Sequence, residues 1–370
     1  MAERKEISTD LLHNLVETNS IEDLSTEQIL SSFSTDHLLR ISLDPIKFII
    51  DPRSGEPIIF NPARAVRPHD YPAGGDNKIE CPICAGKSTG IVDLAELQEG
   101  FTFINKNLYP VLNPPAPKKE IRGESSSGLH FIQWTSSFHD RDWHNLPDED
   151  CVIVLSRLAV LERKLLSVSR DISDLRSQSQ TSSPDEWYIS IIKNVGSAVG
   201  GSLEHGHQQI LLGDIAPRRI VNNRRFLDQH GQTFSAYLQT SNPTSLLVHD
   251  YGPALLLVCE FMRRPYEMVL LLKDTNKRYL HEMDQSEMEA IALGWKNASQ
   301  VIRKLMPTLN KQVAYNVITH NGPGAGLYFE FLPYTQEQGG LEQLGLSICQ
   351  TEPEQAAQDI REQLTKLKSS

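Results

Sequence analysis

The sequence of 370 residues has only five cysteines, no long apolar run and a formal net charge of -11. Five scattered cysteines are too few for a disulfide framework, and the longest apolar run, at 254–259, is too short to span a bilayer. The first ten residues lack the apolar core of a signal peptide, so we expect a cytoplasmic protein without membrane contact. The acidic balance argues against nucleic-acid binding, which needs a basic face.

Hydrophobic residues make up 39% of the chain and charged residues 22%, a composition typical of globular proteins. Residues 1–40 are polar with helical spacing of leucines, and predict an extension without chemistry of its own. Beyond them, one order of predicted elements occurs twice. It consists of strands, then a long helix, and then two strands joined by a glycine-rich turn. We therefore predict a duplicated α+β protein, with a catalytic half at 41–217 and a second, non-catalytic half at 218–370.

The stretch 194–210, NVGSAVGGSLEHGHQQI, predicts a strand, a glycine-rich turn and a second strand. His205, His207 and Gln209 alternate along that second strand. Because alternate side chains of a strand leave the same face, the pattern predicts two imidazoles and an amide directed at one place. An ordinary buried strand histidine is the alternative interpretation of each ring.

A histidine beside such a turn is suited to phosphate chemistry. A neutral imidazole can attack phosphorus and carry the group as a phosphoramidate, and its ordinary pKa of about 6.5 keeps the neutral form available near pH 7. The amides of Gly200 and Gly201 and the side chains of Ser202 and Gln209 could stabilise the non-bridging oxygens. The pattern favours a nucleophilic histidine.

Two arginines, Arg64 and Arg67, follow a strand candidate at 57–60. Guanidinium groups pair bidentately with phosphate oxygens, so both are candidates for binding a polyphosphate. A solvated basic loop is the alternative. The proline-bounded segment also lies far from the histidines in the sequence, so the two must meet through the fold.

Cys81 and Cys84 form a Cys-x-x-Cys pair that can direct two thiolates at one ion. A tetrahedral zinc site needs two further ligands. One of the two central histidines and a histidine from 137–144 could supply them, leaving the other central histidine to face a ligand. A degraded knuckle with two reduced thiols is the alternative.

Together these motifs resemble the galactose-1-phosphate uridylyltransferase family of the histidine-triad superfamily. The family signature Ser-x-x-His-Pro-His-x-Gln corresponds to 202–209, where Gly206 replaces the proline. The arginine segment, the cysteine pair and C-terminal stretches at 340–342 and 351–357 follow the family order, so the similarity spans roughly 43–367. Several spaced motifs in one order are more specific than any single motif.

The resemblance implies a duplicated histidine-triad-like fold, in which two antiparallel sheet-plus-helix halves form a half-barrel, and a homodimer. It implies transfer of a nucleoside monophosphate, UMP foremost, from a nucleotide sugar to a sugar 1-phosphate through a covalent nucleotidyl-histidine. Inorganic phosphate as the acceptor would make the protein a nucleotide-sugar or dinucleoside-polyphosphate phosphorylase. A chain without catalysis would be a nucleotide-binding zinc protein.

The resemblance also implies residue roles. The catalytic group comprises the nucleophile His207 with Gln209 and Ser202. The nucleotide and phosphate ligands are Arg64, Arg67, Asn105, Asn107, Asn194, Gly200 and Gly201. Zinc would be bound by Cys81, Cys84, His139 and His205, with His139 preferred over His144, and Glu342 would accept a sugar hydroxyl. A second metal site of some relatives is expected to be absent, because Tyr328 and Glu330 stand at its His-x-His pair beside His320.

Overall fold

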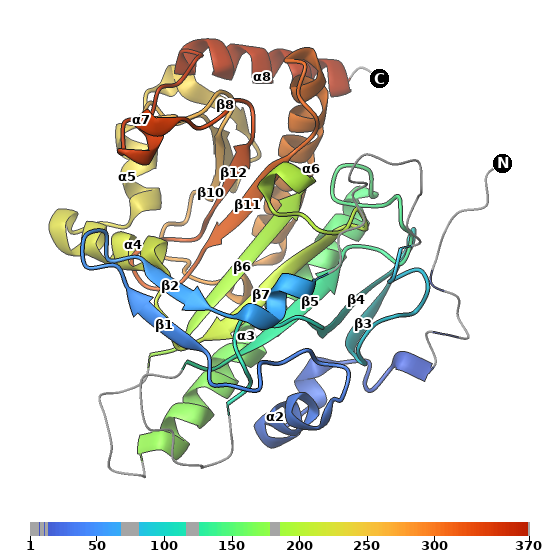
Figure 1. Ribbon diagram of the computed structural model, residues 1–370. Coiled ribbons are helices and arrows are strands. Elements are labelled where there is room, and N and C mark those ends of the chain that lie inside the picture. The colour runs from blue at the N-terminus through green and yellow to red at the C-terminus, as the bar shows by residue number, and fades with distance from the viewer. Residues whose placement is uncertain are drawn as a thin grey trace.

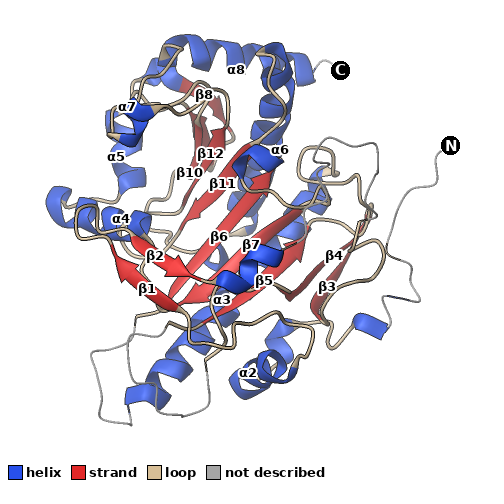
Figure 2. Ribbon diagram, viewed as in Figure 1, coloured by secondary structure: helices blue, strands red, loops and turns tan. Residues whose placement is uncertain are grey.

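The computed structural model describes residues 14–67, 81–115, 126–177 and 186–368, together with Ile7 and Leu11. Its centre is one open, antiparallel ten-stranded sheet, shown in Figure 2, with the order β3-β4-β5-β7-β6-β11-β12-β10-β9-β8. The strands are β3 (Ile91–Leu97), β4 (Gly100–Lys106), β5 (Gly128–Trp134), β6 (Tyr188–Val195), β7 (His207–Gly213), β8 (Leu247–Asp250), β9 (Ala254–Leu257), β10 (Met268–Leu272), β11 (Tyr315–His320) and β12 (Tyr328–Pro333). The structure combines an antiparallel sheet with helices, which confirms the predicted α+β class at this general level.

The two halves of the sheet have the same order of elements. Each half runs through three strands, a long helix and two further strands, with α3 (Asp148–Ser177) in the first half and α6 (Gln285–Thr308) in the second. The inner strands β6 and β11 pair antiparallel, with Asn194 opposite Asn316. The halves therefore form one sheet and meet at the strand that precedes the glycine-rich turn.

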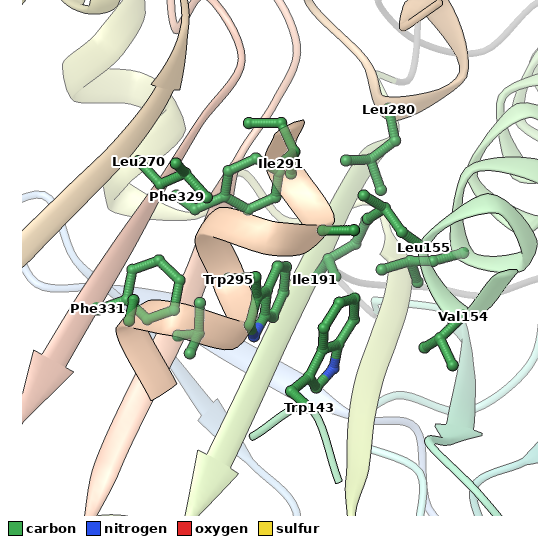
Figure 3. Packing of buried hydrophobic residues seen from close by; sticks show 14 of the residues in the cluster. Trp143, Val154, Leu155, Ile191, Leu270, Leu280, Ile291, Trp295, Phe329 and Phe331 are labelled. Carbon is green, nitrogen blue, oxygen red and sulfur yellow. The ribbon is translucent and has the colours of Figure 1, made fainter. Parts of the chain in front are cut away.

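Both long helices pack on the same face of the sheet and join the halves in one core. The buried face of α6 repeats at three- and four-residue intervals, as an amphipathic helix requires. Trp143, just before α3, stacks on Trp295 of α6 with ring centroids 4.5 Å apart. Figure 3 shows these rings between the helices and the strand residues Ile191 and Phe329. Stacked indoles bury a large apolar area, so this contact fixes the loop before α3 against the second half.

The opposite face of the sheet is covered in part by the hairpin of β1 (Lys47–Ile50) and β2 (Pro57–Phe60), which lies in front of the sheet in Figure 1. Phe48 and Ile59 of the hairpin and Leu211 of β7 pack against one small core, formed by Ile46, Leu112 and Ile215. The short helix η2 (Pro62–Val66) continues from β2 and carries the arginine segment. The hairpin thus brings the arginines to the sheet face that α3 and α6 leave open.

The other elements surround the sheet. They are η1 (Ile21–Asp23), α2 (Thr26–Thr35), η3 (Ser197–Val199), α4 (Arg218–His230), α5 (Phe234–Ser241), η4 (Thr244–Leu246), η5 (Leu280–Glu282), α7 (Gly340–Gln343) and α8 (Pro353–Lys368). Ile21, Ile29 and Phe33 belong to the main core, so this part of the expected N-terminal extension packs against the sheet-and-helix body. The boundaries of the predicted domains stay a prediction. No helix within the described ranges is long and apolar enough to cross a membrane.

Candidate active site

The open face of the sheet carries polar residues on its central strands. Because side chains alternate along a strand, His207 and Gln209 of β7 face away from the long helices, as does Asn194 of β6. Asn316 of the neighbouring strand β11 donates to the Asn194 oxygen at 2.7 Å. In contrast, Gln208 points toward the helices and accepts a hydrogen bond from the Trp143 indole at 3.2 Å.

The strand β7 begins at His207, so His205 lies in the turn before the strand. The prediction that His205, His207 and Gln209 share one strand face was therefore wrong for His205. The connection from β6 to β7 contains Gly196 and Gly200, whose φ angles of 88° and 84° are accessible mainly to glycine. Strand β7 starts only after His205 and Gly206, so only the ring of His207 belongs to the strand.

His205 instead joins Cys81, Cys84 and His139, whose possible ligand atoms all lie within 4.8 Å of one another. The Nδ1 atom of His205 is 3.8 Å and 3.6 Å from the two sulfurs. These distances match the edge of about 3.6 Å between sulfur and nitrogen in a tetrahedral zinc site. The Nε2 atom of His205 donates to the Ser136 carbonyl at 2.8 Å, which leaves Nδ1 as the metal-facing atom.

The four residues fit a zinc ion in number, type and geometry. A hydrogen bond from Cys84 chiefly lowers the pKa of the Cys81 thiol, and a thiolate is the form that binds metal. The alternative ligand, His144, lies outside this group. Among the described residues, this Cys₂His₂ cluster is the only group of three or more His, Cys, Asp and Glu ligands that could hold a metal ion.

The ring of His207 is held in one tautomer. Its Nδ1 atom is 2.8 Å from the His205 carbonyl oxygen, which can only accept, so Nδ1 carries the proton. Burial, followed by the charge of Lys193, lowers the pKa of His207 to about 4. The neutral ring therefore keeps a lone pair on Nε2, the atom that a nucleophile needs.

Two contacts that the sequence did not suggest position this histidine. Its ring lies 5.0 Å from the ring of Trp134, whose indole donates to Asn105 at 3.0 Å. On the other side of the sheet, the buried ammonium of Lys193 donates to the main-chain oxygen of His207 at 3.0 Å and pairs with Asp142 at 2.8 Å. The alternation of HFIQW along β5 could have indicated Trp134, but nothing local marks Lys193.

The arginine segment meets the glycine-rich turn through the fold. Arg64 donates to the Tyr109 carbonyl, and Arg67 lies 3.5 Å from the Gly200 oxygen. Burial, then the charge of Arg67, lowers the pKa of Arg64 to about 10, and neither arginine pairs with a carboxylate in the described part of the chain. Two neighbouring, partly buried cations without counter-ions favour an anionic ligand here.

His130 of β5 is a further residue of this face that sequence reasoning missed. Burial, then the charges of Arg64 and Arg67, lowers its pKa to about 3, so its ring is neutral. It lies beside Gln209, which connects the arginines to the β7 face. A histidine four residues before Trp134 on one strand was the available signal.

Some predicted ligands are engaged within the protein. Asn105 accepts from Trp134 and donates to Ser88, and the Asn107 oxygen accepts from the Tyr109 amide at 2.9 Å. Ser202 is half-buried beside the exposed Gly200 and the buried Gly201. The ligand roles assigned to all of these residues stay predictions.

Glu342, which the resemblance suggests as a sugar ligand, lies in the one-turn helix α7. Its carboxylate accepts from the Gly339 amide at 2.7 Å. A hydrogen bond from its own backbone amide, followed by the one from Gly339, lowers the pKa of Glu342. The carboxylate thus caps the N-terminus of its own helix, because an acceptor at this position satisfies a backbone amide that has no partner within the helix. Its sugar-binding role stays a prediction.

The second half has different residues at the positions of the central motif. Gly196 and Gly322 both follow an inner strand with positive φ, and His207 and Tyr328 both begin the next strand. Tyr328 and Glu330, which were expected in place of a His-x-His pair, both lie on this second strand. Glu330 accepts from His320 at 2.9 Å, so these two side chains are paired with each other.

The glycine between the two central histidines is required by packing. A Cβ atom at Gly206 would lie 2.7 Å from the Asp142 carboxyl carbon and 2.9 Å from the Arg141 carbonyl oxygen. We therefore expect Gly206→Ala to lower the free energy of unfolding by about 1 to 3 kcal/mol through overpacking. Urea unfolding would measure this loss. Gly340→Ala, whose Cβ would meet nothing within 4 Å, is the control, and equal stability of both variants would contradict the account.

The arrangement corresponds to a known class of protein. A solved uridylyltransferase structure superposes with a TM-score of 0.63 at 20% identity, covering 86% of this chain and 99% of its own. The fold is therefore that of the uridylyltransferases. No family model matches the chain.

Two curated relatives support the same conclusion. ADP-glucose phosphorylase of Arabidopsis thaliana is 22% identical over 344 residues, which is 84% of this chain and 91% of the relative. Galactose-1-phosphate uridylyltransferase of Thermotoga maritima is 28% identical over 228 residues, 59% of this chain and 64% of the relative. The predicted resemblance to the galactose-1-phosphate uridylyltransferase family is thereby confirmed.

Proposed function

We propose that this protein transfers a nucleoside monophosphate, UMP, from a nucleotide sugar to a sugar 1-phosphate through a covalent intermediate on His207. The observation that carries the proposal is the hydrogen bond of 2.8 Å between His207 Nδ1 and the His205 carbonyl. It leaves Nε2 of a neutral ring free to attack, on the sheet face to which the arginine segment is brought. The relatives named above act on nucleotide sugars or sugar phosphates, which agrees with this choice of substrate class.

In the first step, Nε2 of His207 attacks the α-phosphorus of the nucleotide sugar. The new P–N bond forms as the bond to the bridging oxygen breaks, and the sugar 1-phosphate leaves with that oxygen and its electron pair. The ring becomes cationic, and the His205 carbonyl stabilises it by accepting the Nδ1 proton's hydrogen bond. Arg64 and Arg67 would hold the phosphate charges of the donor, since guanidinium groups pair well with phosphate oxygens.

In the second step, a phosphate oxygen of the acceptor attacks the same phosphorus and the P–N bond breaks, which restores neutral His207. A sugar 1-phosphate then yields a new nucleotide sugar. Inorganic phosphate would instead yield a nucleoside diphosphate. This second candidate is favoured by the similarity to ADP-glucose phosphorylase over 84% of the chain.

The discharge of isolated nucleotidyl-enzyme distinguishes these acceptors. The protein would be incubated with UDP-glucose and ADP-glucose, freed of donor, and weighed intact at mildly alkaline pH, where a phosphoramidate survives. We expect a UMP adduct that galactose 1-phosphate or glucose 1-phosphate removes. Removal by inorganic phosphate alone would select the phosphorylase. Binding of nucleotide without any adduct would contradict the covalent mechanism and leave a nucleotide-binding zinc protein.

The proposal extends to the assembly of the protein. We infer that the two halves are a duplicated histidine-triad-like unit forming a half-barrel, because both have the same order of three strands, a helix and two strands. Zinc in the Cys₂His₂ cluster would supply structural cross-linking between 81–84, His139 and His205. A homodimer and a cytoplasmic location complete the proposal, and analytical ultracentrifugation would test the first of these.

A further inference from the structure

A cavity of about 550 Å³ opens at the end of the sheet where β7 begins. Its walls are the loop at 139–145 except Trp143, the end of β6 with the following glycine, the segment 203–207 that ends in His207, Arg303 of α6 and Val313. It reaches side chains such as Lys193 that point toward the long helices, away from the arginine segment. A volume of this size suits a small molecule, since ligand pockets typically measure about 300 to 1,000 Å³.

The cavity is lined by three cations and three carboxylates, which are Arg141, Lys193, Arg303, Asp140, Asp142 and Glu204. Lys193 is buried and pairs with Asp142 at 2.8 Å, and Arg141 pairs with Glu99 at 3.0 Å. Arg303 is half-buried and makes no hydrogen bond or ion pair with any residue that the structure describes. A partly desolvated guanidinium without a partner favours an anion that can accept its planar set of donors.

His144 adds a second unused donor beside this arginine. Its Nδ1 atom is buried and has no hydrogen-bond partner within the described ranges. Burial, followed by the charge of Arg303, lowers the pKa of His144 to about 4, so the ring is neutral and the two groups are neighbours. A neutral imidazole with a proton on Nδ1 would donate to an anion bound at Arg303. Buried polar atoms without partners are rare, so a missing acceptor is the simplest explanation.

The buried carboxylate of the cavity, Asp142, is already engaged by donors of the protein. The Asp142 carboxylate receives hydrogen bonds from Thr135 at 3.0 Å and from the Trp143 amide at 2.9 Å, besides the Lys193 ammonium.

We propose that this cavity binds a phosphate group, held by the guanidinium of Arg303 and the imidazole of His144, as a site separate from the arginine segment. The ligand is either free inorganic phosphate or a phosphate monoester, and the volume leaves room for a sugar attached to the phosphate. The same cavity is also lined by His207 and Asn194, to which the proposed function gives roles, whereas Arg303 and His144 have no role in that reaction. Phosphate binding at these two groups can therefore be tested without the covalent step. The ammonium of Lys193 also contacts the His207 carbonyl, which connects this site to the open face of the sheet.

Calorimetric titration of the full chain with inorganic phosphate and with glucose 1-phosphate tests the proposal. Arg303→Met should weaken phosphate affinity by about 10-fold or more, because it removes charge-assisted hydrogen bonds. His144→Phe should weaken affinity in the same direction. The neighbouring exposed Lys304→Met is the matched control and should bind like the unmodified protein. Circular dichroism would establish that each variant is folded.

The outcomes separate the possible sources and sites. Arg303-dependent binding of both compounds identifies the free anion as sufficient, whereas binding of glucose 1-phosphate alone identifies a phosphate monoester. Unchanged affinity in Arg303→Met, or no binding by the unmodified protein at millimolar concentration, would overturn the proposal. Binding that is lost in Arg64→Met but kept in Arg303→Met would place the phosphate at the arginine segment and overturn it as well. None of these measurements depends on formation of a nucleotidyl adduct.

Discussion

Replacing His207 by glycine is expected to abolish the nucleotide adduct while leaving the fold intact. The ring is buried at the start of β7 and packs on Trp134, but it is not part of the Cys₂His₂ cluster. No other group of the described open face combines a neutral ring with a proton held on Nδ1 by a carbonyl, so no substitute nucleophile is expected. Loss of the covalent step typically costs several powers of ten in rate. Intact mass after incubation with nucleotide sugar measures the adduct.

The matched control is His37→Gly, which removes an exposed imidazole far from the sheet centre in the sequence. This variant should form the adduct as the unmodified protein does. An adduct that persists in His207→Gly would show that another residue is the nucleophile. Unfolding of His207→Gly with loss of bound metal would instead show that the metal ligand and the nucleophile had been exchanged in the assignment.

Features that depend on residues close together in the sequence could be predicted, because the backbone geometry of a single strand or turn determines them. Alternation along β7 placed His207 and Gln209 on one face, and the spacing of Cys81 and Cys84 indicated a metal knuckle. The position of His205 was not predictable in this way. Its alternation with His207 resembles a continuing strand, but the turn that ends before His207 directs its ring to the cysteines instead.

Contacts between segments that are distant in the sequence could not be predicted from such patterns. Lys193 is an ordinary residue in a strand until the loop at 139–145 brings Asp142 to its ammonium group. The choice of His139 over His144 as a metal-cluster member also depends on how that loop folds, because the two residues are only five positions apart. Likewise, the connection between the last two strands is longer in the first half, from Val195 to His207, than in the second, from His320 to Tyr328, and the sequence pattern did not show this difference.

The second large effect is expected from Cys81→Ser, which should remove bound metal and strongly destabilise the first half. The cluster joins three segments distant in sequence, and Cys81 lies in a small core with Ile91 and Trp134, the residue that packs on His207. Because metal binding to a site absent from the unfolded chain contributes directly to folding, we expect a loss on the order of 4 kcal/mol. Elemental analysis and urea unfolding measure the two quantities.

Cys349→Ser is the matched control, since this half-buried thiol lies outside the cluster and donates only to the Thr351 carbonyl. We expect it to keep one zinc per chain and near-normal stability. A chelator should lower the stability of the unmodified protein and of Cys349→Ser, but not that of Cys81→Ser, because the latter has no metal left to lose. Zinc retained by Cys81→Ser, or no metal in the unmodified protein supplied with zinc, would show that the four residues pack as reduced thiols and neutral imidazoles. In that case the orientation of Trp134 and His207 would rest on protein packing alone.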